Sequence, residues 1–206
     1  WSNGDSFGAD DVIHNFRRWL DPKTGSSNQG RFSSMTTTTD TGNKDEDGNA
    51  IMSTTEAGGA LEKVDDHTVR FHLNNGDLSL PESMADYPAL IVHKHFDDEG
   101  GDLVKNPVGT GPYALKDFAV GEKATLVRRN DSAWWGGEVN LDQISYIDHG
   151  DDPAAQIAAL ASDQVDTNYQ TSIEQVETIK HLPDLKIYER VTAQTAVARM
   201  QVTVKP

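Results

Sequence analysis

Two histidines set two positions apart are the residues of this chain best suited to metal chemistry. His93 and His95 follow the apolar run Ala89–Val92, which predicts a strand. Side chains at positions i and i+2 of a strand lie on one face, so both imidazoles could reach the same ion. The chain offers no third ligand at a defining spacing, which favours an exposed polar turn before Gly100. We therefore predict no metal ligand here.

An acidic stretch within residues 40–56 resembles the first half of a calcium-binding loop. It reads Asn-Lys-Asp-Glu-Asp-Gly over residues 43–48. Such a loop needs oxygen ligands at positions 1, 3 and 5, glycine at position 6 and a bidentate glutamate at position 12. Position 12 is Thr54 here, and Glu56 stands two places late. Because the defining ligand is missing, we predict a surface loop without calcium over the polar residues 36–59.

Gly109, Gly111 and Ala114 match the spacing of a dinucleotide-binding fingerprint. That fingerprint follows a strand and opens a helix, so that the phosphate meets a helix N-terminus. In this chain Pro112 and a strand-like alternation from Tyr113 follow the glycines. The context is wrong for a nucleotide site, and we predict no cofactor.

Two common catalytic motifs are absent from the sequence. It contains no His-Glu-x-x-His and no phosphate-binding loop. It also contains no cysteine, which excludes thiol catalysis and disulfides. Carboxylates are numerous, so a secreted hydrolase with a paired acid and base stays open as the alternative. The leading prediction is a binding protein with no catalytic residues.

The charge balance of the chain is strongly acidic. Its 206 residues hold 18 Lys and Arg against 33 Asp and Glu, for a formal net charge of −15. Nucleic acid is excluded as a partner because phosphate binding needs a basic face. No apolar run reaches the length of about 18 residues that a membrane-spanning helix requires. Since the chain starts at Trp1 and ends after a strand-like run, we interpret it as a piece of a longer protein.

Local patterns predict the elements of the first half. A helix is expected over residues 9–20, where two aspartates suit the positive end and an apolar stripe repeats at helical spacing. A hairpin is expected over Leu61–Leu73, and a short helix over Leu80–Tyr87. The helical stripe consists of Val12, Ile13, Phe16, Trp19 and Leu20.

The middle of the chain holds a rigid, turn-rich crossing at Asn106–Tyr113, with the sequence Asn-Pro-Val-Gly-Thr-Gly-Pro-Tyr. Its two prolines fix φ, and its two glycines permit backbone angles that other residues avoid. Helices and strands alternate beyond it, which predicts an α/β second half. The expected helices are 153–162 and 172–182, and the expected strands are 113–116, 124–127, 144–148, 185–189 and 197–199.

Three stretches in register resemble one protein family. They are Pro-Val-Gly-Thr-Gly-Pro-Tyr at 107–113, Trp-Trp-Gly-Gly at 134–137 and the opening Trp-Ser-Asn-Gly-Asp-Ser-Phe-Gly-Ala-Asp-Asp-Val at 1–12. Together they resemble the signature of the extracytoplasmic solute-binding proteins of peptide and nickel ABC importers, family 5. Ser-Asp-Gln-Val-Asp at 162–166 also resembles a family segment, with Asp163 in place of the usual glycine.

The resemblance implies a mixed α/β fold of the periplasmic binding protein type, with two lobes that close on a ligand. The chain would be an incomplete fragment of that fold. Residues 1–105 would form most of a smaller, loop-rich α+β lobe. Residues 106–206 would form the central section of the main α/β lobe.

The resemblance also implies a function and its partners. The protein would capture a small solute in the periplasm, with an oligopeptide or dipeptide first, and deliver it to an ABC permease in the membrane. It would be a monomer without cofactor or metal. A nickel complex, sugar or opine stays open as the ligand, and a binding module that feeds a sensor stays open as the role. The implied ligand contacts are Asp86, Tyr87, Tyr169, Gln170 and Arg199.

Overall fold

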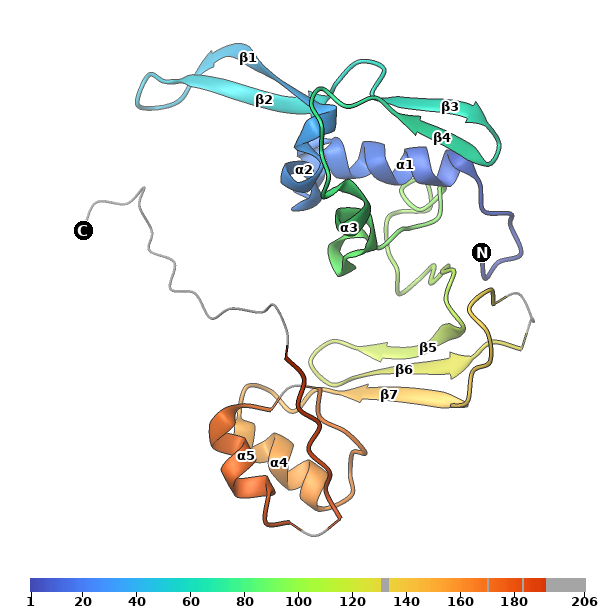
Figure 1. Cartoon of the computed structure of the whole chain (residues 1–206), viewed down its shortest axis with the longest axis vertical. Coiled ribbons are helices and arrows are strands. Elements are labelled where there is room, and N and C mark those ends of the chain that lie inside the picture. The colour runs from blue at the N-terminus through green and yellow to red at the C-terminus, as the bar shows by residue number, and fades with distance from the viewer. Residues whose placement is uncertain (131–133, 170, 183, 192–206) are drawn as a thin grey trace. The chain divides into compact units, whose positions relative to one another are not determined.

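The described part of the chain combines helices with antiparallel strands (Figure 1). The structure is a computed structural model, and it describes residues 1–130, 134–169, 171–182 and 184–191. The mixture of elements agrees with the predicted α/β (mixed) class. No helix within these ranges is both long enough and apolar enough to cross a membrane.

Two compact units divide the chain, Trp1–Ile147 and Asp148–Pro206. The first unit contains most of the helices and all the strands of the described residues. The predicted lobe boundary between residues 105 and 106 falls inside the first unit and stays a prediction.

The first unit begins with helix α1, Ala9–Leu20, which confirms the predicted helix. The carboxylate of Asp11 caps its start by accepting a hydrogen bond from the backbone N–H of Gly8 at 2.9 Å. Acidic residues in the first turn and arginines in the last turn suit the helix dipole. Short helical turns follow, namely η1 (Pro22–Thr24), α2 (Asn28–Arg31) and η2 (Ser33–Met35).

Helix α1 buries its apolar stripe in an aromatic core. The ring of Phe16 lies 5.0 Å from the rings of Trp19 and Phe32, and 4.7 Å from that of Phe71, between centroids. Phe32 and Leu20 are fully buried. Burial of one such side chain stabilises a fold by about 1.5–3 kcal/mol. The predicted stripe is therefore confirmed as core.

A hairpin of two strands replaces the surface loop predicted over residues 36–59. Strand β1, Thr36–Lys44, pairs antiparallel with β2, Ala50–Glu56. Thr38 lies opposite Thr54, and their hydroxyl oxygens are 2.9 Å apart. The loop prediction was wrong because it gave the polar composition more weight than the strand preference of the β-branched threonines.

The predicted hairpin over Leu61–Leu73 is confirmed by strands β3, Leu61–Asp65, and β4, Thr68–Phe71. It is tied to the start of α1 at two points. The backbone N–H of Ala9 donates to the carbonyl of Asp66 at 2.8 Å, and the Lys63 ammonium donates to the Asp10 carboxylate at 2.8 Å. The hairpin thus covers the N-terminal end of the helix.

The strand predicted over Ala89–Val92 does not form. Helix α3, Leu80–Ala85, confirms the short helix, and the turn η3, Tyr87–Ala89, leads into irregular backbone. The side chain of Asn15 takes the place of a neighbouring strand. It accepts from the N–H of Val92 at 2.8 Å and donates to the carbonyl of Val92 at 2.7 Å.

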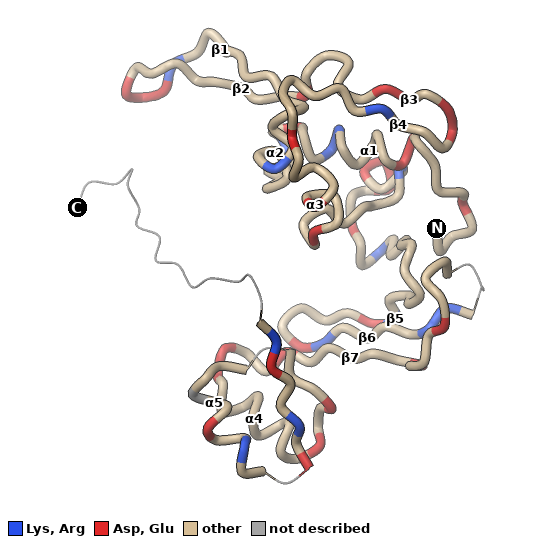
Figure 2. Tube along the Cα trace, in the orientation of Figure 1, with Lys and Arg blue, Asp and Glu red and all other residues tan. Residues whose placement is uncertain are grey.

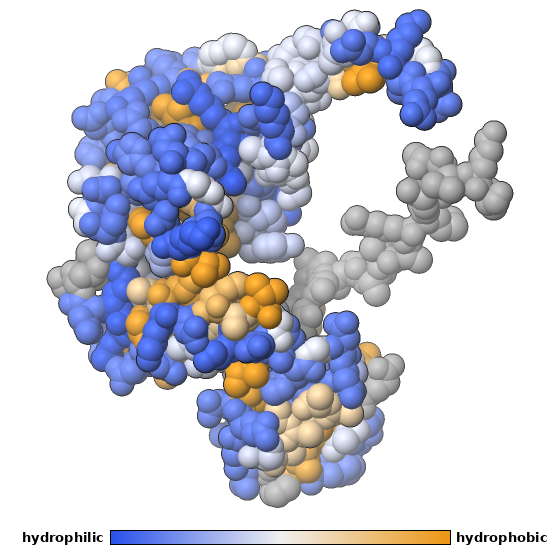
Figure 3. Space-filling view, turned by 180° about the vertical axis from the view of Figure 1, so that it is seen from behind, coloured by the Kyte–Doolittle hydropathy of each residue, from blue (hydrophilic) through white to orange (hydrophobic). Residues whose placement is uncertain are grey.

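An antiparallel sheet of three strands follows the crossing, in the order β5-β6-β7. Gly121 supplies the positive φ of 71° in the turn between β5 and β6. The predicted strands in this region are confirmed. Figure 3 shows apolar residues at the surface of the first unit. Phe118 of β5 and Tyr146 of β7 are exposed. The strand bounds are β5 Tyr113–Ala119, β6 Lys123–Arg128 and β7 Gln143–Ile147.

The second unit holds two capped helices, as predicted. The side chain of Asp152 caps α4, Pro153–Ala161, and the hydroxyl of Ser172 caps α5, Ile173–Ile179. The Gln175 side chain joins them by donating to the carbonyl of Pro153 at 3.2 Å.

Three details of the second unit differ from the sequence-based expectation or lie beyond it. Ala159 is the buried residue of α4, whereas Ile157 and Leu160 are half-buried and Ala161 is exposed. The strand predicted at 185–189 is irregular backbone. The strand predicted at 197–199 lies outside the described residues.

Asn15→Ala is expected to lower the free energy of unfolding by about 1–3 kcal/mol, because it leaves both backbone groups of Val92 without their partner. Urea unfolding followed by circular dichroism measures the change. Asn75→Ala, at an exposed position, is the matched control and should leave stability within experimental error. Equal stability of the two variants would contradict the role given to Asn15.

The stability contributed by Lys63 is expected to disappear only at strongly alkaline pH. Hydrogen bonds to Asp10 and then Asp66 raise the pKa of Lys63 from 10.5 to about 12. A raised pKa means that the contribution is complete below pH 10.5 and is lost as the pH rises through 12. The stability difference between wild type and Lys63→Met should therefore be constant from pH 7 to 10 and shrink above, as urea unfolding would show. A difference that is already lost at pH 9 would contradict this assignment.

Candidate ligand-binding site

The opening of the chain and the mid-chain crossing lie side by side. The backbone N–H of Ser2 donates to the carbonyl of Gly109 at 2.9 Å, and the N–H of Gly109 donates to the Ser2 hydroxyl at 3.1 Å. These bonds join residues that are 107 positions apart. The opening segment and the crossing at Asn106–Tyr113 are thus held together as a pair.

The crossing is also bonded to the end of strand β6. The backbone N–H of Arg129 donates to the carbonyl of Pro112, and its Nη1 donates to the carbonyl of Gly111, both at 2.9 Å. Pro112 has no backbone N–H, so its carbonyl is the backbone group that it can offer to Arg129. Arg129 thereby sets the path of the chain into the sheet.

A cavity of about 430 Å³ opens beside this crossing. Its walls come from segments that are widely separated in sequence. Trp135, from the Trp-Trp-Gly-Gly stretch at 134–137, lines the cavity and is 81% exposed. The cavity itself was not predicted, because no local pattern links its walls. They are Trp1, Phe7, Ile91, Thr110, Arg129 and Trp135.

Asp86 and Tyr87 form a corner between α3 and η3. One carboxylate oxygen of Asp86 accepts from the backbone N–H of Tyr87 at 2.9 Å, and the other lies 2.7 Å from Nη1 of Arg31. The Asn28 side chain donates to the carbonyl of Pro88 at 2.6 Å. The corner is held from both sides, while the Tyr87 side chain is 80% exposed. This geometry leaves the Tyr87 ring exposed at the surface.

The other predicted ligand contacts belong to the second unit. Tyr169 is 96% exposed. Gln170 and Arg199 lie outside the described residues.

The histidine pair is built differently from the exposed turn that the sequence suggested. His93 is buried, whereas His95 is exposed. Nε2 of His93 lies 3.0 Å from the carboxylate of Asp5, and its ring packs edge-on against Trp1 at 5.1 Å. Its Nδ1 accepts from the backbone N–H of His95 at 3.3 Å. The prediction of exposure was wrong for His93 because the opening segment covers it.

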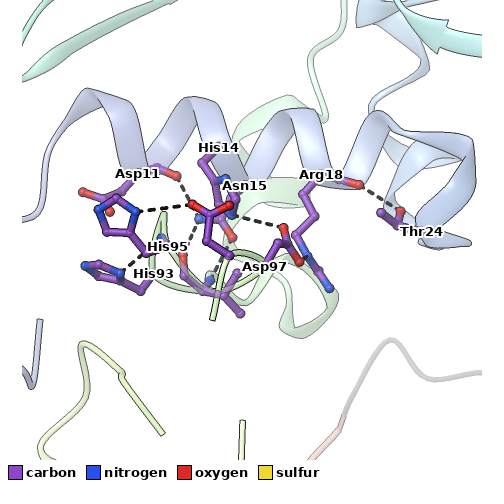
Figure 4. Close-up of polar contacts among 10 residues, drawn as sticks. Asp11, His14, Asn15, Arg18, Thr24, His93, His95 and Asp97 are labelled. Carbon is purple, nitrogen blue, oxygen red and sulfur yellow. Dashed lines mark hydrogen bonds and ion pairs between the residues drawn. The ribbon is translucent and has the colours of Figure 1, made fainter. Parts of the chain in front are cut away.

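Ion pairs tie the segment after His93 to helix α1 (Figure 4). The carboxylate of Asp97 lies 3.1 Å from Nε of Arg18 and 3.5 Å from Nε2 of His14. Both partners lie on the helix, one turn apart. Sequence reasoning missed this contact, because nothing in the local pattern pairs residues that are 79 positions apart.

In the acidic turn between β1 and β2, the carboxylate of Asp45 makes hydrogen bonds within the turn. Asp45 accepts hydrogen bonds from the backbone N–H groups of Asp47 and Asn49 and from the Asn49 side chain. These bonds, led by the Asn49 side chain, hold the pKa of Asp45 below its usual value. Among the residues that the structure describes, no group of three or more candidate ligands could hold a metal ion.

A family model for bacterial extracellular solute-binding proteins, family 5 (its middle region), matches residues 1–206. The match covers the paired crossing, the corner and both units. The chain belongs to the family 5 solute-binding proteins.

Individual relatives are consistent with this family. Heme-binding protein A of Haemophilus influenzae is 25% identical over 192 residues, which is 89% of this chain and 32% of that protein. Di/tripeptide-binding protein 4 of Pseudomonas aeruginosa is 26% identical over 195 residues, which is 89% of this chain and 33% of that protein. The chain thus spans about a third of the length of these relatives.

The fold is also that of known binding proteins. The structure of a dipeptide-binding protein from Pseudoalteromonas sp. SM9913 in complex with Met-Leu superposes with a TM-score of 0.63. The superposition covers 88% of this chain and 34% of that one, at 22% sequence identity. The predicted fold of the periplasmic binding protein type, present as a partial fragment, is confirmed.

Ser2→Ala is expected to weaken the pairing of the two crossing segments. It removes the acceptor of the Gly109 N–H, which should lower the free energy of unfolding by about 0.5–1.5 kcal/mol. Chemical unfolding of the full-length protein measures this loss. Ser6→Ala, at an exposed position in the same segment, is the control. If both substitutions had the same effect, the hydroxyl of Ser2 would not contribute to the pairing.

Proposed function

We propose that the full-length protein captures a small solute, a dipeptide or oligopeptide, and delivers it to an ABC permease. The observation that carries this proposal is the family match over the whole chain, 1–206. The printed names of relatives add support for a peptide, since one is a di/tripeptide-binding protein. The location would be periplasmic, as the word extracellular in the family description suggests.

Capture would proceed by closure of two lobes about the paired crossing segments. In this proposal residues 1–105 belong to the smaller lobe and 106–206 to the main lobe. Ligand shifts such an equilibrium only when it binds the closed form more tightly than the open form. The Ser2–Gly109 pairing supports this proposal, because two chain segments that are held together can bend as one hinge.

Tyr87 and Tyr169 are the proposed contacts with the solute. Each presents a flat face with a hydroxyl at its edge, and each is largely exposed. Asp86 is already paired with Arg31 and with the backbone of Tyr87, so we assign it the positioning of that ring. Gln170 and Arg199 stay predictions from the family resemblance.

Binding would occur without turnover, cofactor or metal, and by a monomer. The formal charge of −15 opposes any role in nucleic acid binding. Lys and Arg are scattered along the described chain and not gathered into one basic stripe (Figure 2). The surface therefore suits a small ligand and a membrane protein partner better than a polyanion.

Thermal unfolding of the full-length protein against a ligand panel tests the proposal. The panel contains dipeptides such as Met-Leu, tripeptides, a nickel–histidine chelate and neutral sugars. A dipeptide at 100 times its Kd should stabilise the protein by about 2.7 kcal/mol and raise the Tm. A response to the sugar or nickel complex alone would overturn the peptide assignment. Hydrolysis of the peptide, detected by chromatography, would overturn binding without turnover.

Tyr87→Ala is expected to weaken dipeptide affinity about fivefold, because a stacking aromatic contributes on the order of 1 kcal/mol to a contact. The Tm of the free protein should stay unchanged, since the side chain is 80% exposed. Tyr188→Ala is the matched control, with a side chain 85% exposed. Isothermal titration of both variants measures the effect. Wild-type affinity in Tyr87→Ala would remove Tyr87 from the site.

A further inference from the structure

The cavity of about 430 Å³ beside the crossing is lined mainly by aromatic side chains. Its volume lies within the range of about 300–1,000 Å³ that is usual for small-molecule pockets. Trp1, Phe7 and Trp135 form aromatic walls, and Ile91 adds an aliphatic wall. All four residues belong to the first unit. The walls therefore suit a flat, apolar molecule.

The Trp1 wall is held in place by its neighbours. The centroid of the Trp1 ring lies 5.8 Å from that of Phe7 and 5.1 Å from that of the buried His93. The next residue, Ser2, is hydrogen-bonded to Gly109 in the crossing. This side of the cavity is thus preorganised, which lowers the ordering cost of binding a ligand.

The polar groups of the lining favour a neutral ligand. Arg129 is the one charged residue among the described residues that line the cavity. Its guanidinium donates to the carbonyl of Gly111, and Arg129 has a further interaction besides. A ligand carboxylate would therefore lose hydration without gaining an ion partner of its own.

Thr110 supplies the polar group that a neutral ligand can use. Its hydroxyl lines the cavity and makes no hydrogen bond within the described part of the chain. A hydroxyl both donates and accepts, so it can bond an alcohol, a phenol or an indole N–H. One polar group among apolar walls is enough to orient a small ligand.

We propose that this cavity binds a small neutral aromatic molecule that carries one hydroxyl or N–H group. The ring would pack against the indoles of Trp1 and Trp135, and its polar group would bond the hydroxyl of Thr110. Trp135 is 81% exposed, so the ligand would cover apolar surface that faces water in the free protein.

This site is separate from the proposed solute contacts. Neither Asp86 nor Tyr87 lines the cavity, and Tyr169 belongs to the second unit. A ligand in the cavity would touch Trp1 of the opening segment and Thr110 of the crossing. Its binding should therefore raise the Tm and leave solute binding intact.

Isothermal titration of the full-length protein with three probes tests the proposal. The probes are 2-phenylethanol, its saturated counterpart 2-cyclohexylethanol and the anion phenylacetate. 2-Phenylethanol should bind saturably, at least threefold more tightly than 2-cyclohexylethanol and at least tenfold more tightly than phenylacetate. Smaller preferences would overturn the inference. Absence of saturable binding would overturn it as well, including the case in which another segment of the longer protein fills the cavity.

A second titration, in the presence of saturating Met-Leu dipeptide, separates this site from the solute site. The affinity for 2-phenylethanol should stay unchanged. Competition by the dipeptide would overturn the inference, because the cavity would then be part of the solute site. If Met-Leu itself did not bind, the proposed function would fail, whereas the titration without dipeptide would still decide the inference about the cavity.

Substitutions locate the binding site. Trp135→Ala should weaken 2-phenylethanol at least fivefold, and Trp135→Phe should restore most of the affinity. Tyr146→Ala, which truncates an exposed aromatic residue outside the lining, is the matched control and should bind as the wild type does. Wild-type affinity in Trp135→Ala, or an equal loss in Tyr146→Ala, would overturn the assignment.

Thr110→Val tests the proposed hydrogen bond. Valine keeps the shape of the wall and removes the hydroxyl, so the affinity for 2-phenylethanol should fall at least threefold. The affinity for ethylbenzene, which has no polar group, should not fall. Equal effects on the two ligands would show that Thr110 does not bond the ligand and would overturn this orientation.

Discussion

The buried side chain of Asn15 is the interaction on which the first unit depends. It sits on α1, within reach of the aromatic core, and it satisfies both backbone groups of Val92. Its Nδ2 also donates to the carbonyl of Asp11 in its own helix. A buried amide with every bond made acts as a specific link between elements, because any other register would leave polar groups unpaired.

The link between Asn15 and Val92 determines where several functional groups lie. Ile91, which precedes Val92, becomes a wall of the cavity, and His93, which follows it, is buried against Asp5 and Trp1. The opening segment is thereby held in place, and its Ser2 meets Gly109 in the crossing. The pairing of Ser2 with Gly109 is thus connected to the helical core through a short chain of contacts.

Positive charge is scarce in this acidic chain, and the structure uses it at defined places. Arg31 holds the Asp86 corner, Arg18 holds Asp97 against α1, and Arg129 holds the crossing at the end of β6. Each of these cations therefore holds one segment of the first unit in place. Surface ion pairs contribute little to stability as a rule, so their main effect here is to select one geometry.

Much of the fold followed from residues that are close in sequence. The capped helices α1, α4 and α5 and the hairpin of β3 and β4 were predicted from spacing, caps and turns. The family was predicted from the resemblance of three short stretches to its signature. Asp163 adopts a φ of 56° where the family usually has glycine, so even that departure kept the local turn. Such signals act over a few residues and can be read directly.

Tertiary structure alone decided that Val92 bonds a side chain instead of a strand, that His93 is buried and that six separated residues enclose a cavity. Those outcomes depend on contacts between residues tens of positions apart, which no local pattern specifies.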